Sequence, residues 1–170
     1  MATEQPRYEL VDRHPSFEVR LYAPGVLAET VVSGPPSVVS REGFGRLAGF
    51  IFGGNQRRQS IAMTAPVVQH RESDGRWSVA FHMPVEWPLE RLPAPLDGRV
   101  RLRPHGSQRY AARRFRGDWD EGRFSFEAAQ LAEAVRASGL RPAGPASWAR
   151  YDPPWVPPMQ RTHDVLLPLE

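Results

Sequence analysis

The chain has 170 residues, no cysteine, and 22 basic against 19 acidic residues, for a formal net charge of +3. Without a thiol, the protein has no disulfide, iron–sulfur cluster, zinc–thiolate site or cysteine nucleophile. Every basic residue is an arginine, which also excludes a Schiff-base lysine and a phosphate-loop lysine. A chain of this length fits one domain, and we expect a single domain over residues 1–170.

The first predicted elements are three short strands. Apolar residues alternate around Tyr8, then around Val19, and then over residues 26–32. The turn signals His14-Pro15 and Ala23-Pro24-Gly25 separate these stretches. Alternation with period two, bounded by proline and glycine, is typical of strands.

A change of period after residue 36 predicts a helix over about 37–52. Ser37 follows two prolines and is the expected N-cap, and Gly53-Gly54-Asn55 is a strong stop signal. A helical wheel gives the expected buried face, which consists of Ser40, Phe44, Leu47, Ala48 and Ile51.

The remaining elements follow in the same way. Strands are expected at residues 60–70 and 76–84 on either side of an Asp74-Gly75 turn, then at 99–105 and 109–117, and finally at 164–169. Met63 is expected in the core of the first of these strands, with a ligand role as the alternative. A second helix is expected from the N-cap Ser125 to the C-cap Gly139.

The order of strands and helices is similar in residues 7–95 and 98–169, although their sequences are not. This order predicts a duplicated α+β unit, with two helices covering a largely antiparallel sheet that curls toward a barrel.

Three separated motifs carry a family resemblance. They are "IFGGNQRRQSIAMTAPV" from residue 51, "FHMP" from residue 81 and "RYDPPWVPPMQRTHDVLLPL" from residue 150. Together they resemble the SOUL family of haem-binding proteins. The resemblance implies a distorted antiparallel β-barrel of two pseudo-repeated halves flanked by two helices. It also implies haem, or another tetrapyrrole, as the ligand.

The resemblance assigns haem contact to the first helix and to the loop before the last strand. In this chain the expected contact residues are Val38, Arg41, Gly45, Arg46, Gly49, Phe50, Trp155, Met159 and His163. His163 is the candidate axial ligand of the haem iron. Some relatives have a basic residue and a methionine where this chain has Glu42 and Gly45.

The outer strip of the first helix is unusual because two glycines lie four residues apart on it. Each glycine costs about 1 kcal/mol of helix stability relative to alanine. Two explanations are open. A neighbouring loop packs closely against the glycines, or a flat apolar ligand lies on them while Arg41 or Arg46 reaches a propionate.

The sequence favours a haem-binding protein with a shallow hydrophobic groove over an enzyme, because it contains no nucleophile elbow, triad or metal-ligand spacing. Two other functions are open. An enzyme that removes or exchanges the metal of a tetrapyrrole would need an acid–base pair, for which Glu42 and His163 are the candidates. An effector module would bind a hydrophobic amphiphile or another protein at the same surface.

The sequence also predicts where the protein acts. Its first residues show no basic start followed by an apolar core, and no stretch of about 18 residues is uninterruptedly apolar, so we expect a cytoplasmic protein without a membrane span. Its arginines are scattered rather than gathered in a stripe, so we expect no nucleic-acid partner.

Overall fold

The computed structural model describes residues 3–170, which form two compact units. The first unit contains Pro24–Gly106 together with residues 3–5, and the second contains Pro6–Ala23 and Ser107–Glu170. The expected halves of 7–95 and 98–169 therefore differ from the observed units at the N-terminal end. The first two strands belong to the second unit because they extend its sheet.

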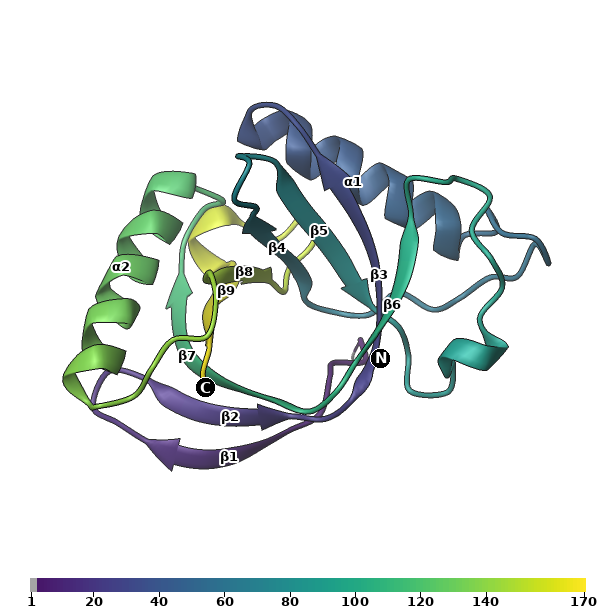
Figure 1. Ribbon diagram of the computed structural model, residues 1–170. Coiled ribbons are helices and arrows are strands. Elements are labelled where there is room, and N and C mark those ends of the chain that lie inside the picture. The colour runs from purple at the N-terminus through teal and green to yellow at the C-terminus, as the bar shows by residue number, and fades with distance from the viewer. Residues whose placement is uncertain (1–2) are drawn as a thin grey trace. The chain divides into compact units, whose positions relative to one another are not determined.

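The first unit is an antiparallel sheet with one helix on one face. Its strands β3 (Gly25–Val32), β4 (Val67–Arg71), β5 (Trp77–His82) and β6 (Arg101–His105) lie in the order β4-β5-β3-β6. Helix α1 (Pro36–Ile51) lies across β3 and β5 (Figure 1). A short 3-10 turn, η1 (Leu89–Arg91), lies between β5 and β6.

The second unit repeats this plan with five strands. They are β1 (Tyr8–Arg13), β2 (Glu18–Tyr22), β7 (Gln108–Arg116), β8 (Ser147–Arg150) and β9 (Thr162–Pro168), in the order β1-β2-β7-β9-β8. Helix α2 (Glu121–Ala137) packs against β7 and β9 (Figure 1), and the 3-10 turn η2 (Pro158–Gln160) precedes β9. The prediction of a SOUL-like α+β fold with two similar halves and two helices is confirmed.

Helix α1 is rotated relative to the prediction. Phe44, expected in the core, is 43% exposed, whereas Phe50, expected on the outer strip, is only 2% exposed. The cause is Gly43, whose backbone lies directly on β5: a Cβ there would come within 2.7 Å of Val79 Cγ2. The face turned to the sheet consists of Val39, Gly43, Leu47, Ala48, Phe50 and Ile51.

The ends of α1 are set by proline and glycine. The helix begins with Pro36 after the N-cap Pro35, so the predicted cap at Ser37 is wrong; a proline at the first position lacks only an N–H that the helix does not use. Beyond its last residue, Gly53 has φ +113°, a conformation that favours glycine, and the Gly54 N–H donates to the Gly49 carbonyl.

Residues 60–66 differ from the prediction because they do not form a regular strand. Only isolated bridges occur there, and β4 begins at Val67. Met63, expected in the core of a strand, is half-buried in this irregular segment.

Helix α2 begins four residues before the predicted N-cap Ser125. The Asp120 side chain accepts a hydrogen bond from the Gly122 N–H at 2.9 Å and so caps the helix. This earlier start brings Phe124 into the buried face, where it stacks on Trp148 of β8. Strand β8 was not predicted, because it has only four residues.

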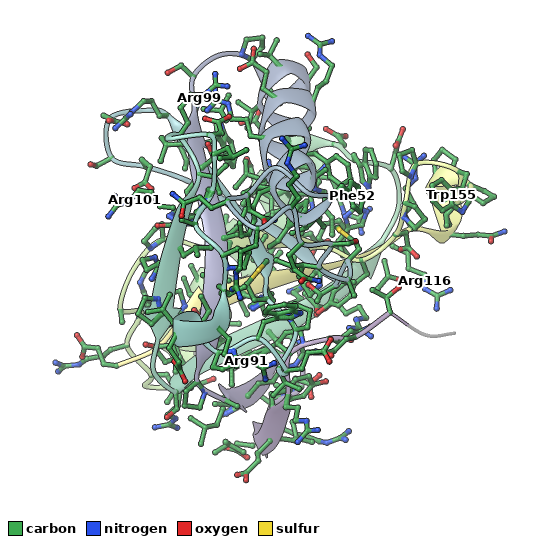
Figure 2. The ribbon with its side chains drawn as sticks, turned by 90° about the vertical axis from the view of Figure 1, so that its right-hand side faces the viewer. Phe52, Arg91, Arg99, Arg101, Arg116 and Trp155 are labelled. Carbon is green, nitrogen blue, oxygen red and sulfur yellow. The ribbon has the colours of Figure 1, made fainter. Side chains whose placement is uncertain are left out.

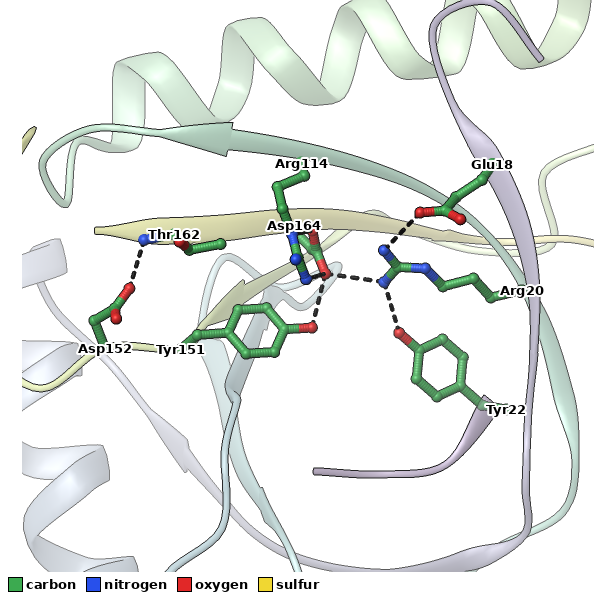
Figure 3. A network of polar contacts seen from close by, with 8 residues as sticks. All are labelled: Glu18, Arg20, Tyr22, Arg114, Tyr151, Asp152, Thr162 and Asp164. Atoms are coloured by element: carbon green, nitrogen blue, oxygen red, sulfur yellow. Dashed lines mark hydrogen bonds and ion pairs between the residues drawn. The ribbon is translucent and has the colours of Figure 1, made fainter. Parts of the chain in front are cut away.

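A buried ionic network connects β2, β7 and β9 in the second unit (Figure 3). The Asp164 carboxylate accepts hydrogen bonds from Arg20 at 2.9 Å, from Arg114 at 3.0 Å and from the Tyr151 hydroxyl at 2.7 Å. Arg20 also donates to the Tyr22 hydroxyl at 2.9 Å. Arg20 and Asp164 are both fully buried, so each needs charged partners. Arg20 pairs with Asp164 at 2.9 Å and with the Glu18 carboxylate at 3.0 Å.

The arginines determine the protonation state of this network. Burial acts to raise the pKa of Asp164, but the hydrogen bonds and charges of Arg114 and Arg20 outweigh it, so the pKa of this carboxyl lies below its ordinary value. Burial raises the pKa of Tyr22 to about 12. The network therefore holds a carboxylate and neutral tyrosines at neutral pH.

Neither α1 nor α2, the two α-helices within residues 3–170, is long and apolar enough to cross a membrane.

Replacing Asp164 with Asn is expected to lower the free energy of unfolding by about 3–5 kcal/mol, because it removes the buried anion of Arg20 and leaves this arginine only the partly exposed Glu18. Since the pKa of Asp164 is lower in the folded protein, its contribution is complete above the ordinary carboxyl pKa and is lost as the pH falls through the folded pKa. Urea unfolding between pH 7 and pH 3 should therefore show a shallower pH dependence for the variant. Asp74→Asn, which breaks an exposed pair with Arg76, is the control and should behave as the wild type. Equal stability of Asp164→Asn and wild type would contradict this role.

The three glycines of α1 should respond differently to alanine. Gly43→Ala is expected to lower the free energy of unfolding, because overpacking against Val79 costs about 1–3 kcal/mol and exceeds the gain in helix propensity. Gly45→Ala and Gly49→Ala meet no atom within 4 Å and should stabilise the protein by about 0.5–1 kcal/mol each. Thermal and urea unfolding of the three variants would measure this, and the same sign at all three positions would disprove the assigned rotation of α1.

Candidate functional site

The exposed side of α1 presents a strip almost without side chains. Gly45 and Gly49 are exposed, and a Cβ at either position would have no atom within 4 Å. At 100° per residue, Arg41, Gly45, Gly49 and Phe52 lie within an arc of about 80°. We call these four residues the glycine strip. The structure thus favours an open surface over close packing of a loop against the two glycines.

Phe52 supplies the apolar end of the glycine strip. It is the C-cap residue of α1, and its side chain is 65% exposed (Figure 2). The sequence prediction missed it because the helix was placed in the wrong rotation. Counting Gly43 as a core residue would have revealed the correct phase, since Val39, Gly43 and Leu47 recur every four residues on one face.

The two arginines predicted to reach a propionate have different environments. Arg46 is turned toward β3, where it donates to the Thr30 hydroxyl and the Val31 carbonyl, both at 3.1 Å, and it pairs with Glu42 at 3.3 Å. Arg41 is exposed, and its side chain forms no hydrogen bond or ion pair with any residue from 3 to 170. Arg41 is therefore the free arginine of the glycine strip.

The second unit presents large apolar side chains on the loop before β9, residues 152–161. Trp155 is 83% exposed and Met159 is 79% exposed, and Trp155 projects away from the loop (Figure 2). Four prolines lie between residues 153 and 158 and restrict the backbone. An exposed tryptophan on a restricted loop is a preformed apolar contact surface.

Arg161 holds this loop in shape. Its guanidinium donates to the backbone carbonyls of Val156 at 3.0 Å and Pro154 at 2.7 Å, and to the Asp118 carboxylate at 2.8 Å. The same group lies 4.4 Å from the centre of the Trp119 ring. One planar cation thus fixes the loop at two backbone positions, a role that the single charge of a lysine does not fill.

The geometry corrects the axial-ligand prediction for His163. This side chain is fully buried and stacks on Phe115, with ring centroids 4.7 Å apart. The Trp148 indole N–H donates to Nδ1 at 2.9 Å, so Nε2 carries the proton and donates to the Gly117 carbonyl at 2.7 Å. Both nitrogens are engaged, and neither has a lone pair for iron.

The structure also changes the assignment of other predicted site residues. Phe50 is in the core under α1 and is not on the surface, so its predicted ligand contact is wrong. Val38 is half-buried at the N-terminal end of α1. The proposed acid–base pair of a metal-exchanging enzyme loses His163, because its nitrogens are occupied. Within residues 3–170, no group of three or more histidine or carboxylate side chains is arranged to hold a metal ion.

Comparison with known proteins gives relatives of both sequence and fold. The chain is 26% identical to heme-binding protein 1 of Xenopus tropicalis over 149 residues, which is 84% of this chain and 78% of that protein. Among solved structures, it resembles an uncharacterized conserved protein from Listeria innocua, with a TM-score of 0.65 and 12% identity over 99% of this chain and 94% of the other. It also resembles the C-terminal domain of EcmrR, with a TM-score of 0.69 and 9% identity over 96% and 98% of the two chains. At these identities the structural matches establish the fold alone.

The family comparison covers nearly the whole chain. Residues 3–168 match the model of the SOUL heme-binding protein family, so the resemblance carried by three motifs extends over both units. Membership implies haem as the cofactor, in agreement with the sequence prediction. This protein belongs to the SOUL heme-binding protein family.

Proposed function

We propose that the protein binds haem, or a related tetrapyrrole, with one face of the macrocycle on the glycine strip of α1. The observation that carries the proposal is the open space above Gly45 and Gly49, in a chain of a haem-binding family. The strip provides the flat cradle that such a ligand requires.

The flatness of the strip explains two glycines that otherwise weaken the helix. A planar macrocycle gains dispersion and hydrophobic energy only where it approaches the surface closely, and a side chain at either glycine would hold it away. Burial contributes about 25 cal/mol per Å² of apolar area, so an aromatic ring as large as haem gains several kcal/mol from one covered face. Phe52 adds an apolar contact at the end of the strip.

Arg41 completes the polar part of this proposal. A tetrapyrrole with propionates presents carboxylates at its edge, and arginine pairs with a carboxylate through two parallel hydrogen bonds. Glu42 lies next to Arg41 in the sequence and would repel a propionate, but its charge is partly offset by the ion pair with Arg46. In the bound complex, the propionates therefore lie next to Arg41.

Ligation of the iron is not part of the proposal, because His163 has both nitrogens engaged within the second unit. When bound, haem supplies any electron-transfer chemistry, and the protein supplies binding and orientation. The loop of residues 152–161 is the second contact surface that the family resemblance implies. Its contribution is tested by its own variants, because it belongs to a different unit.

If haem lies on the glycine strip, a side chain at Gly49 should weaken its binding. Gly49→Gln adds a neutral side chain that helices tolerate, so we expect no loss of stability. Because this side chain would hold the macrocycle away from the strip, we expect at least tenfold weaker binding of hemin. The measurement is titration of tag-free protein with hemin, followed by the Soret absorption band. Arg41→Gln should weaken binding by a smaller factor of about 5, and more strongly at low ionic strength.

The control for this experiment is Ser37→Gln, which adds the same side chain to the exposed side of α1 about 120° around the helix from Gly49. It should bind hemin as the wild type does. Equal affinity of wild type and Gly49→Gln would contradict the glycine strip as the site. Absence of a saturable Soret change in the wild type would contradict haem binding itself and favour the amphiphile-binding or protein-binding alternative.

A further prediction concerns the loop before β9. Trp155→Ala should weaken hemin binding about fivefold or more without reducing stability, because the side chain is almost fully exposed. Arg161→Lys keeps the charge but loses the fork to two carbonyls, and it should also weaken binding. Leu96→Ala, at another exposed apolar residue, is the control. Wild-type affinity of both loop variants would remove the loop from the site and leave the strip unaffected.

A further inference from the structure

Two histidines of the first unit meet on the face of the sheet opposite α1. His82 is the last residue of β5 and His105 is the last residue of β6, and β3 runs between these strands. In register, Leu27 pairs with His82 and Gly25 pairs with His105, so both imidazoles lie on one face. Their ring centroids are 6.2 Å apart, with an angle of 79° between the planes.

Gly25 makes room for this arrangement. A Cβ at this position would lie 3.2 Å from His105 Nε2, closer than ordinary packing allows. The backbone of Gly25 is not in the left-handed region, so its conformation does not require glycine. The absence of a side chain instead lets the His105 ring lie over β3 toward His82.

The hydrogen bonding of His105 leaves one nitrogen available. Its Nδ1 lies 3.1 Å from the Gly106 carbonyl, which can only accept, so Nδ1 carries the proton. Nε2 then holds a lone pair, and this atom is buried without a hydrogen-bond partner among the described residues. Metal-binding histidines have this same pattern, in which one nitrogen is anchored to a carbonyl and the other is free for the ion.

We propose that His82 and His105 form a site for a divalent transition-metal ion. Imidazole ligands suit Cu²⁺, Ni²⁺ and Zn²⁺, and Cu²⁺ is expected to bind most tightly. With only two protein ligands, the other coordination positions are open to water or a small ligand. The site goes beyond haem binding, because it lies on the sheet face opposite the helix that carries the glycine strip.

The observed geometry needs only a small adjustment. With metal–nitrogen distances of about 2.0–2.1 Å, two imidazoles on one tetrahedral ion have centroids roughly 5 Å apart, so the rings must approach by about 1 Å. Burial, together with the neighbouring His105, lowers the pKa of His82 to about 4, so this imidazole is neutral at neutral pH.

The experiment titrates haem-free, tag-free, full-length protein with CuSO₄ at pH 7, using calorimetry for stoichiometry and electron paramagnetic resonance for the nitrogen ligands. We expect one ion per chain with two coordinated nitrogens. His82→Ala and His105→Ala should each weaken binding at least tenfold and leave at most one coordinated nitrogen. Circular dichroism of every variant checks that it is folded.

Two further sets of variants make the test decisive. His14→Ala and His70→Ala are matched controls, since each of these side chains lies beside a carboxylate outside the pair, and they should bind Cu²⁺ as the wild type does. Gly25→Val retains all five histidines but occupies the space of the His105 ring, so it should also weaken binding. Copper binding that survives both His82→Ala and His105→Ala, or that is lost only in the controls, would overturn the proposal. Because no haem is present, neither result bears on the glycine strip.

Discussion

The close approach of α1 to β5 at Gly43 is the constraint on which the candidate site depends. With no side chain between the helix backbone and Val79, the helix has only one rotation that lets Gly43 face the sheet. That rotation buries Phe50 and turns Gly45 and Gly49 outward. The glycines of α1 thus have two separate roles: one allows packing, and two leave the outer surface flat.

In the second unit, arginine organises both the core and the surface. Arg20 is buried and needs Asp164 as a counter-ion, which connects two strands distant in sequence. Arg161 uses its planar group to hold two carbonyls of the loop before β9. A chain without lysine can form such multiple contacts readily, because guanidinium presents several donors in a fixed plane.

His163 and His105 differ in how many of their ring nitrogens form hydrogen bonds. His163 is closed to metals because an indole N–H and a backbone carbonyl occupy both of its nitrogens. His105 has only one nitrogen engaged, and its other nitrogen is buried near His82. Residue type alone does not reveal this difference. His163, which lies in one of the family motifs, is a structural residue here. His82 of the FHMP motif and His105, which lies outside the motifs, together have the features of a ligand site.

By itself the sequence determined the fold class, both helices, most strands and the family, because hydrophobic period and turn residues are local properties of the chain. It also indicated the unusual pair Gly45 and Gly49. Only the tertiary structure decided the rotation of α1, the burial of Phe50 and the exposure of Phe52, because the position of Gly43 in the core depends on Val79, a residue 36 positions away in the chain. The state of His163 was likewise decided by partners that folding brings near, since hydrogen bonds to an indole and a backbone carbonyl distant in the chain leave no pattern in the sequence. For His105, folding decided the burial of Nε2 and the position of the ring against Gly25 and near His82.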